Sequence, residues 1–159
     1  MYSPYTNAPP IHRKAGIIAI SSSKCEVLLI QDKRIYNSPS RGNGWGLPKG
    51  KRDGYETPAE TAKREFREET SLDIELDKSI PDFIHSYISN GIVPKDIRIH
   101  YFIHQLDCNF KCPNIDTEEI KQIKLVNINE LEQYLNEHNG TNIIKFIREM
   151  TVDYIDPLT

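Results

Sequence analysis

The stretch Gly44–Leu72, GWGLPKGKRDGYETPAETAKREFREETSL, begins with glycines and basic residues and ends in closely spaced acids. Near its middle, Thr57 is followed by a proline and, three positions later, by Glu60. This is the signature of a capping box with proline at the first helical position, and it predicts a helix over Pro58–Thr70. Apolar residues recur within that range at helical spacing and predict a buried stripe. The stripe consists of Ala59, Ala62 and Phe66.

Three glutamates of this helix share one face. Glu65 lies three positions before Glu68 and four before Glu69, and residues at these spacings are neighbours on a helix. Like charges so placed destabilise an isolated helix by about 0.2–0.5 kcal/mol per pair. A hard divalent cation bound by the carboxylate oxygens would offset this repulsion. The alternative is an acidic face that is simply solvated. Arg64 stands at helical spacing from Glu60 and Glu68 and is expected to pair with both.

The spacing of residues from Gly50 to Leu72 resembles the box of the Nudix hydrolase family. That box reads Gly-x5-Glu-x7-Arg-Glu-U-x-Glu-Glu-x-Gly-U, where U is a bulky aliphatic or similar residue. The chain agrees at eight of the nine defined positions, and the exception is Ser71, which replaces the last glycine. This glycine normally ends the helix in a left-handed conformation, which Ser71 can adopt at a cost of about 1 kcal/mol. The resemblance covers about residues 13–150.

The resemblance implies a fold of the α/β class, an α/β/α sandwich with a mixed β-sheet between helices. It also implies a site for Mg²⁺ or Mn²⁺, made of three carboxylates with the backbone carbonyl of Gly50 assisting. The three carboxylates are those of Glu65, Glu68 and Glu69. Arg64 would orient these glutamates, and Glu56 would anchor the loop ahead of the helix. The implied reaction is hydrolysis of a nucleoside diphosphate linked to another group, in which the cation neutralises the diphosphate and activates water.

The identity of the general base is open between two places. One candidate is Glu68 itself. The other is the segment ahead of an expected strand at Ile120–Val126, where Glu118 and Glu119 stand together. This segment resembles the Glu-Ile-x-x-Ile segment of mRNA-decapping Nudix enzymes, in which Glu119 takes the matching place. The alternative is that both acids belong to a surface loop and have no part in catalysis.

The run Trp45–Lys51, WGLPKGK, resembles two branches of the family, the mRNA-decapping enzymes and the dinucleoside tetraphosphate hydrolases. Three basic residues in this region suit a polyanionic substrate, namely Lys49, Lys51 and Arg52. Trp45, Tyr36 or Phe102 would stack on a base, unless they serve in packing alone. We therefore expect a nucleotide or capped RNA as substrate, with decapping ahead of dinucleoside polyphosphate hydrolysis. Other nucleotides, diphosphoinositol polyphosphates and a catalytically silent binding module are the further alternatives.

The remaining sequence predicts a single domain over residues 1–159, with residues 1–13 as a polar tail. Expected strands are Ala15–Ile20, Glu26–Gln31, Phe83–Ser89, Ile97–Leu106 and Ile120–Val126, and Trp45–Pro48 is a short extended piece. Two further helices are expected at Asn127–Leu135 and Asn142–Val152, and a polar loop at Asp32–Asn43. Alternation in the fourth strand predicts one face made of Ile97, Ile99, Tyr101 and Ile103.

Composition places the chain among ordinary globular proteins. Apolar residues make up 38% and charged residues 27%, and no apolar run is long enough to span a membrane. The three cysteines lack metal-site spacing, so we expect free thiols and a cytoplasmic setting, with the nucleus as the alternative. Residues 1–52 carry nine Lys/Arg and two Asp/Glu, a balance of +7, against −10 for the rest. This asymmetry predicts a basic wall facing an acidic one, unless the two parts mix in space.

Overall fold

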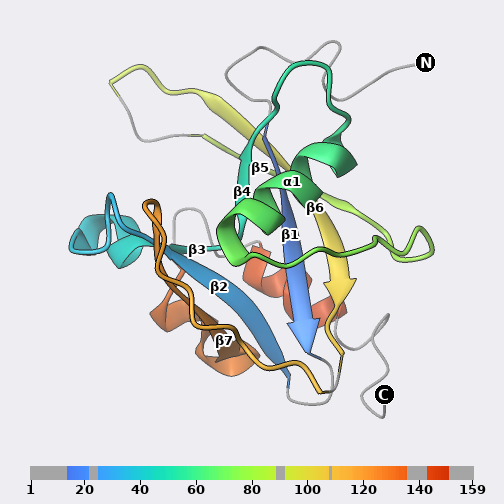
Figure 1. Ribbon diagram of the computed structural model, residues 1–159. Helices are drawn as coiled ribbons and strands as arrows, with labels where there is room; N and C mark the ends of the chain where they lie inside the picture. The colour runs from blue at the N-terminus through green and yellow to red at the C-terminus, as the bar shows by residue number, and fades with distance from the viewer. Residues whose placement is uncertain (1–13, 22–24, 89–91, 108, 136–142, 151–159) are drawn as a thin grey trace.

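A mixed sheet of seven strands runs through the centre of the computed structural model, which describes residues 14–21, 25–88, 92–107, 109–135 and 143–150 (Figure 1). Its main path has the order β3-β2-β1-β6-β5, with β4 paired to β1 and β7 paired to β2. β1 and β6 run parallel, and the other pairs are antiparallel. The strands are β1 (Lys14–Ser21), β2 (Glu26–Asp32), β3 (Trp45–Gly46), β4 (Lys49–Lys51), β5 (Phe83–Ile88), β6 (Asp96–Gln105) and β7 (Ile120–Asn127).

Helical segments cover both faces of the sheet. Helix α1 (Pro58–Thr70) packs on one face through Ala62 and Phe66, which share a core with alternate residues of β1 and β2. Residues 143–150 are helical and pack on the other face together with the 3-10 helix η3 (Ile128–Gln133). The chain therefore has the predicted α/β/α arrangement around a mixed sheet (Figure 1).

The central strands are apolar because both of their faces are covered. In β1, Ile18 and Ile20 face the core on the side of residues 143–150, whereas Ala15, Ile17 and Ala19 face α1, and all five are fully buried. Such continuous apolar runs are typical of strands between two layers. The buried face of β6 is the one predicted from alternation, since Ile99, Tyr101 and Ile103 all lie in the core opposite α1.

Strands β1 and β2 pair only near one end and then diverge. Their pairing is limited to Ile20 with Val27 and Ser21 with Glu26. The segment 45–51 fills the widening gap, because β3 pairs with β2 on one side and β4 pairs with β1 on the other (Figure 1). The Ile17 amide donates to the carbonyl of Pro48 at 3.0 Å and ties this segment down. The glycine- and lysine-rich run is thereby placed inside the sheet, directly beside α1.

Helix α1 has the predicted bounds and the predicted caps. Thr57 accepts a hydrogen bond from the Glu60 amide at 3.2 Å, and the Glu60 carboxylate accepts one from the Thr57 amide at 3.1 Å. The helix ends at Ser71, which has a φ of 64° and lies in the left-handed region. The buried stripe differs in part from the predicted one, because Ala62 and Phe66 are buried, Ala59 is only half-buried, and Thr61 and Thr70 are buried as well. The hydroxyl of Thr70 donates to the backbone carbonyl of Phe66, which satisfies it inside the core.

Three expectations about local structure need correction. The helix expected at Asn127–Leu135 is the shorter 3-10 helix η3, because Asn127 completes β7 and its side chain caps the turn by accepting from the Asn129 amide. The loop expected at Asp32–Asn43 contains a second 3-10 helix, η2 (Pro39–Gly44), in which Gly42, Asn43 and Gly44 have positive φ. The extended piece expected at Trp45–Pro48 forms a strand only at Trp45–Gly46 (β3), and a second short strand, β4, follows at Lys49–Lys51.

Some expectations fall outside the described residues. These are the tail at 1–13, Cys108, the tip of the β5–β6 hairpin at 89–91, and both ends of the last expected helix. Neither Cys25 nor Cys112 is joined in a disulfide. None of the helices in the described part of the chain is both long and apolar enough to cross a membrane.

Replacing Ser71 with glycine should stabilise the protein, because a glycine adopts the left-handed conformation without strain from a Cβ atom. We expect a gain of about 0.5–1 kcal/mol and a rise in Tm of about 2–4 °C, measured by thermal unfolding. The matched control is Ser71→Ala, which keeps the Cβ atom and should give no gain. An equal rise in both variants, or no rise with glycine, would contradict this account of the helix end.

Candidate metal and substrate site

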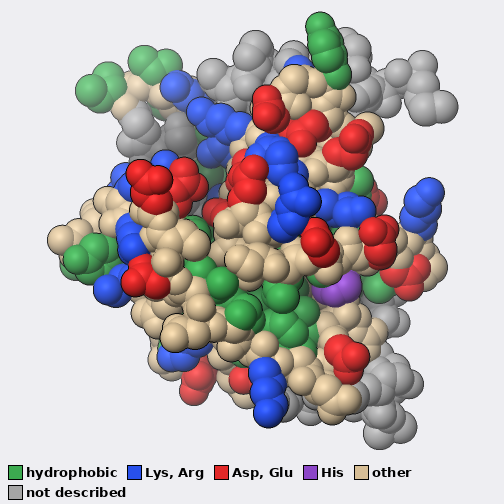
Figure 2. All heavy atoms as spheres, viewed as in Figure 1, with side chains coloured by type: hydrophobic (Ala, Val, Ile, Leu, Met, Phe, Trp, Pro, Cys, Tyr) green, Lys and Arg blue, Asp and Glu red, His purple; other side chains and the backbone are tan. Residues whose placement is uncertain are grey.

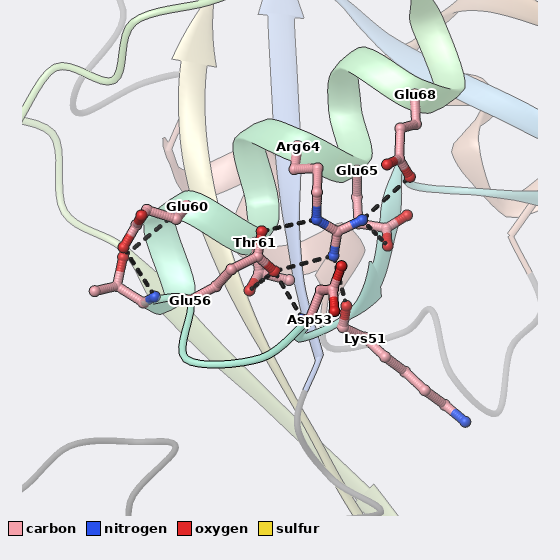
Figure 3. Close-up of polar contacts among 9 residues, drawn as sticks. Lys51, Asp53, Glu56, Glu60, Thr61, Arg64, Glu65 and Glu68 are labelled. Atoms are coloured by element: carbon pink, nitrogen blue, oxygen red, sulfur yellow. Dashed lines mark hydrogen bonds and ion pairs between the residues drawn. The ribbon is translucent and has the colours of Figure 1, made fainter.

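The guanidinium of Arg64 connects the acids of α1 to the loop and strand before it (Figure 3). Its Nε and Nη2 donate to the two oxygens of Glu56 at 2.8 and 3.1 Å. Its Nη1 donates to Glu65 at 2.9 Å and to Glu68 at 3.1 Å. Its Nη2 also reaches the backbone carbonyl of Lys51 at 2.8 Å. These bonds raise the pKa of Arg64, with the Glu56 hydrogen bond as the largest favourable cause.

Of the two partners expected for Arg64, this network confirms Glu68 and corrects Glu60. Glu60 is occupied in the capping box, and the structure pairs Arg64 with Glu56 in its place. Glu56 also accepts from the Asp53 amide and from the Thr61 hydroxyl, so it joins the loop to the first turns of the helix. The Arg64 hydrogen bond lowers the pKa of Glu56, which keeps this carboxylate ionised. The predicted role of Glu56 as an anchor of the loop therefore agrees with its contacts.

Gly50 faces the carboxylate of Glu65. A Cβ atom at position 50 would overlap both oxygens and the carboxyl carbon of Glu65, so only glycine leaves room for this side chain. Burial raises the pKa of Glu65, and the nearby charges of Glu68 and Glu119 add to the rise, whereas Arg64 opposes it. The backbone of β4 and the Glu65 carboxylate thus meet directly, at the place where the Gly50 carbonyl was expected to assist a metal.

Glu69 lies one turn further along the helix and contacts β4 as well. Its carboxylate accepts a hydrogen bond from the Lys49 amide at 2.8 Å. Burial raises the pKa of Glu69 to about 8, and the carboxylates of Glu65 and Asp32 add to the rise, while the Lys49 ammonium opposes it. The charges of two other acids therefore act on Glu69 at this end of the sheet, and one of them, Asp32 of β2, was not singled out from the sequence.

The two candidate bases occupy different positions. Glu68 is more than half exposed and held at one oxygen by Arg64. Glu119 stands just before β7, where its backbone carbonyl accepts from the Lys33 amide at 2.8 Å. The charge of Glu119 acts on Glu65, which places this loop acid near the glutamates of α1. The choice among Glu68, Glu118 and Glu119 as the general base stays a prediction.

The donors at this site fit a hard divalent cation. Glu65 and Glu69 are half-buried carboxylates whose charged forms repel one another, and a divalent cation relieves such repulsion. Among the described residues, no group of three His, Cys, Asp or Glu side chains forms a ready metal cage. Arg64 holds one oxygen each of Glu65 and Glu68. The predicted ligand set of Glu65, Glu68, Glu69 and the Gly50 carbonyl therefore stays a prediction with which the local geometry agrees.

A cavity of about 250 Å³ lies on the sheet face opposite α1. Four aromatic side chains from three strands line it, and Lys49 and Arg41 are its basic residues. The aromatic residues are Trp45, His85, Tyr87 and Tyr101. Trp45 is held edge-on against Tyr134, with ring centroids 5.3 Å apart. Lys49 therefore has its amide on Glu69 and its side chain in the cavity wall, and it connects the two parts of the site.

Not every residue expected at the site lies there. Lys51 and Arg52 are absent from the cavity wall, and Figure 3 shows the side chain of Lys51 pointing away from the glutamates. Phe102 packs with the core on the α1 side, and Tyr36 lies under the ammonium of Lys121. Of the three aromatic residues considered for stacking, only Trp45 lines the cavity.

The cavity residues of β5 and β6 were missed by sequence reasoning. In the sequence, His85 and Tyr87 alternate with residues that are exposed in the structure. This alternation places both side chains on one face of the strand, but it does not show that this face lines a cavity.

The charge asymmetry of the sequence is not preserved in space on the face shown in Figure 2, where acidic and basic side chains lie interleaved over α1. On that face, the structure therefore agrees with the alternative expectation, namely that residues 1–52 and the rest of the chain mix in space.

Comparison with known proteins identifies the family. The NUDIX domain profile matches residues 10–148, which include the whole segment from Gly50 to Leu72. The chain belongs to the Nudix family. The prediction of a Nudix pyrophosphohydrolase rests on this membership and is supported by it. Its residues 50–72 supply the Nudix box, and the single departure is the serine that ends the helix.

Two similar proteins belong to different branches. The m7GpppN-mRNA hydrolase dcap-2 of Caenorhabditis elegans is 25% identical over 145 residues, which cover 86% of this chain and 17% of that protein. The putative 8-oxo-dGTP diphosphatase 3 of Mycobacterium tuberculosis is 44% identical over 48 residues, which cover 30% of this chain and 21% of that protein. The chain thus spans about a fifth of the length of the curated relatives it matches.

Solved structures of the family share the fold. The Ap4A hydrolase of Caenorhabditis elegans, in a binary complex, superposes with a TM-score of 0.60 at 19% identity, covering 88% of this chain and 95% of that one. The NUDIX domain of Shewanella oneidensis NrtR, complexed with ADP ribose, has a TM-score of 0.64 at 17% identity, covering 93% and 92%. At these identities the likeness extends to the fold alone.

Replacing Gly50 with alanine should weaken metal binding much more than it weakens the fold. The new Cβ atom displaces the end of a flexible side chain, Glu65, and the strand backbone accepts alanine without strain. We expect Mn²⁺ affinity to fall by about 10–100-fold, measured by calorimetry, with a Tm close to that of the wild type. The control is Gly46→Ala, whose Cβ atom meets only the Lys49 ammonium at an ordinary 3.6 Å. Unchanged Mn²⁺ affinity in Gly50→Ala would argue against Glu65 as a ligand.

Proposed function

We propose that this Nudix domain hydrolyses the diphosphate linkage of a nucleoside diphosphate joined to another group, with capped RNA as its foremost substrate. The observation that carries the proposal is the position of Lys49. Its amide binds Glu69 of the acidic cluster, and its side chain lines the aromatic cavity. A substrate whose base occupies the cavity would therefore have its phosphates next to the glutamates of α1.

Each part of the site has a role in this proposal. Glu65, Glu68 and Glu69, with the Gly50 carbonyl, would hold Mg²⁺ or Mn²⁺, which would neutralise the diphosphate and activate water. Arg64 keeps the glutamates oriented through its hydrogen bonds. Lys49 would bind a phosphate oxygen, and Trp45 would provide a stacking surface for the base. Because all three box glutamates are retained, a catalytically silent binding module is the weaker alternative.

Two observations favour capped RNA over a dinucleoside polyphosphate. The similarity to the mRNA hydrolase dcap-2 extends over 86% of this chain. Glu119, which takes the place of the decapping glutamate in the Glu-Ile-x-x-Ile resemblance, also acts electrostatically on Glu65. The dinucleoside alternative rests on the resemblance of the Trp45–Lys51 run and on a fold shared with an Ap4A hydrolase at 19% identity.

We propose the cytoplasm as the place of action, where capped RNA and nucleotides are both present.

A substrate panel with Mg²⁺ and with Mn²⁺ tests the proposed function. We expect release of 7-methyl-GDP from capped RNA, and Glu69→Gln should lower kcat/KM by about 100-fold or more, because a metal ligand is lost. The matched control is Glu60→Gln, which removes a carboxylate from the same helix but outside the acidic cluster. Preferential release of ATP and AMP from diadenosine tetraphosphate would favour the alternative. A folded protein without metal-dependent turnover on any substrate would refute the hydrolase proposal.

Replacing Glu119 with glutamine tests the general base. We propose Glu119 for this role, because Glu68 is already bound by Arg64, whereas the loop of Glu119 lies near Glu65. The expected result is a kcat about 100-fold lower, with little change in Mn²⁺ affinity, since a general base typically contributes 10²–10⁴-fold. Glu118→Gln is the neighbouring control and should retain turnover. Near-normal turnover of Glu119→Gln would leave Glu68 as the base.

A further inference from the structure

Three lysines stand in a row on the sheet face that carries the aromatic cavity. In the antiparallel pair of β1 and β4, Lys14 lies opposite Lys51, and Gly16 lies opposite Lys49. A Cβ atom on Gly16 would lie 2.7 Å from the Cβ of Lys49 and 3.0 Å from the ring of Tyr101, so this face is the cavity side. Side chains two positions apart share a face of a strand. Lys14 and Lys51 therefore continue the line of Lys49 away from the cavity.

The two outer charges of this row, on Lys14 and Lys51, differ from that of Lys49, whose ammonium interacts with the charge of Glu69. Within the described part of the chain, no carboxylate forms an ion pair with Lys14, Lys49 or Lys51. Like charges directly opposite one another on paired strands destabilise a sheet. Burial, and then the charges of Lys49 and Lys51, lower the pKa of Lys14. The arrangement therefore favours an anion that bridges Lys14 and Lys51.

The row is also fixed in place relative to the acidic cluster. The backbone carbonyl of Lys51 accepts a hydrogen bond from Arg64 at 2.8 Å, and Arg64 holds Glu65 through the same guanidinium. In β4, the backbone of Gly50 contacts Glu65, whereas Lys49 and Lys51 project to the opposite face. A phosphate chain that starts beside Glu65 and Lys49 reaches Lys51 after two further residues of strand, about 6.6 Å along β4.

We propose that Lys14 and Lys51 form a phosphate subsite next to the hydrolysed diphosphate. In the proposed function, the two phosphates of the hydrolysed linkage lie beside Glu65, Glu69 and Lys49. The subsite would bind the next phosphate group of the substrate. This inference rests on the proposed function, because it assumes that the diphosphate lies at the acidic cluster. It deepens that function by selecting substrates with three or more linked phosphate groups. Lysine suits such a subsite as a point charge for phosphate.

The test compares Lys14→Gln and Lys51→Gln on substrates that differ in phosphate number. The panel is ADP-ribose with two phosphates, the cap dinucleotide with three, diadenosine tetraphosphate with four, and capped RNA. We expect KM for the longer substrates to rise by about tenfold per lysine more than KM for ADP-ribose, with kcat little changed. For capped RNA, the salt dependence of kcat/KM should become shallower by about 0.7 in log–log slope per lysine removed. Lys14→Arg, which keeps the charge, should restore most of the affinity.

The control is Lys63→Gln on α1, whose ammonium pairs with Glu75 outside this row. Equal losses on ADP-ribose and on the longer substrates, or losses matched by Lys63→Gln, would overturn the subsite. A loss confined to capped RNA assigns the bound group to the RNA backbone. A loss that already appears with the cap dinucleotide and diadenosine tetraphosphate assigns it to the bridging polyphosphate.

A binding measurement separates failure of the subsite from failure of the proposed function. Inorganic tripolyphosphate and a 5′-labelled RNA oligonucleotide are titrated into wild type and the lysine variants, without turnover. If no nucleotide is hydrolysed but binding of either probe falls about tenfold in Lys14→Gln and Lys51→Gln, the subsite stands and the proposed reaction fails. If nucleotides are hydrolysed and neither probe nor KM responds to these variants, the reaction stands and the subsite fails.

Discussion

The candidate site depends on one charged group, the guanidinium of Arg64. It joins three parts of the chain, namely the loop through Glu56, the helix through Glu65 and Glu68, and strand β4 through the carbonyl of Lys51. Acids gathered this closely on one helix would otherwise repel one another. The guanidinium is planar and has five N–H donors, so it can donate hydrogen bonds to several of these carboxylates at once and in a fixed geometry. The position of the acids is thus determined by hydrogen bonds as well as by helical spacing.

The divergence of β1 and β2 creates the space that the site occupies. The segment 45–51 fills that space. Because side chains alternate along a strand, one face of this segment contacts α1 and the other contacts the cavity. Gly50 turns toward α1 and leaves room for Glu65, while Lys49 turns toward the cavity and its amide binds Glu69. The acidic cluster and the aromatic cavity therefore lie on opposite faces of the same short strand, and Lys49 contacts both.

Much of the fold was predictable because its signals are local. The capping box and the apolar spacing determined α1 to the residue, and apolar runs or alternation located the long strands. The wrong predictions occurred where a local sequence pattern was compatible with two different structures. The segment after β7 was expected to form a helix over Asn127–Leu135, but it forms only the short 3-10 helix η3, which Asn127 caps. Arg64 was expected to pair with Glu60, but the capping box occupies Glu60, and Arg64 pairs with Glu56 of the loop in its place.

The sequence by itself determined the family, the helix and the face on which Glu65, Glu68 and Glu69 stand, because these depend on spacing within about twenty residues. Only the tertiary structure decided which distant residues join them. Asp32 of β2 and Glu119 of the loop before β7 approach the cluster, and His85, Tyr87 and Tyr101 line the cavity. Strand register likewise places Lys14 opposite Lys51. These contacts depend on how separate strands pair and which face each side chain takes, and spacing along the chain carries no information about that pairing.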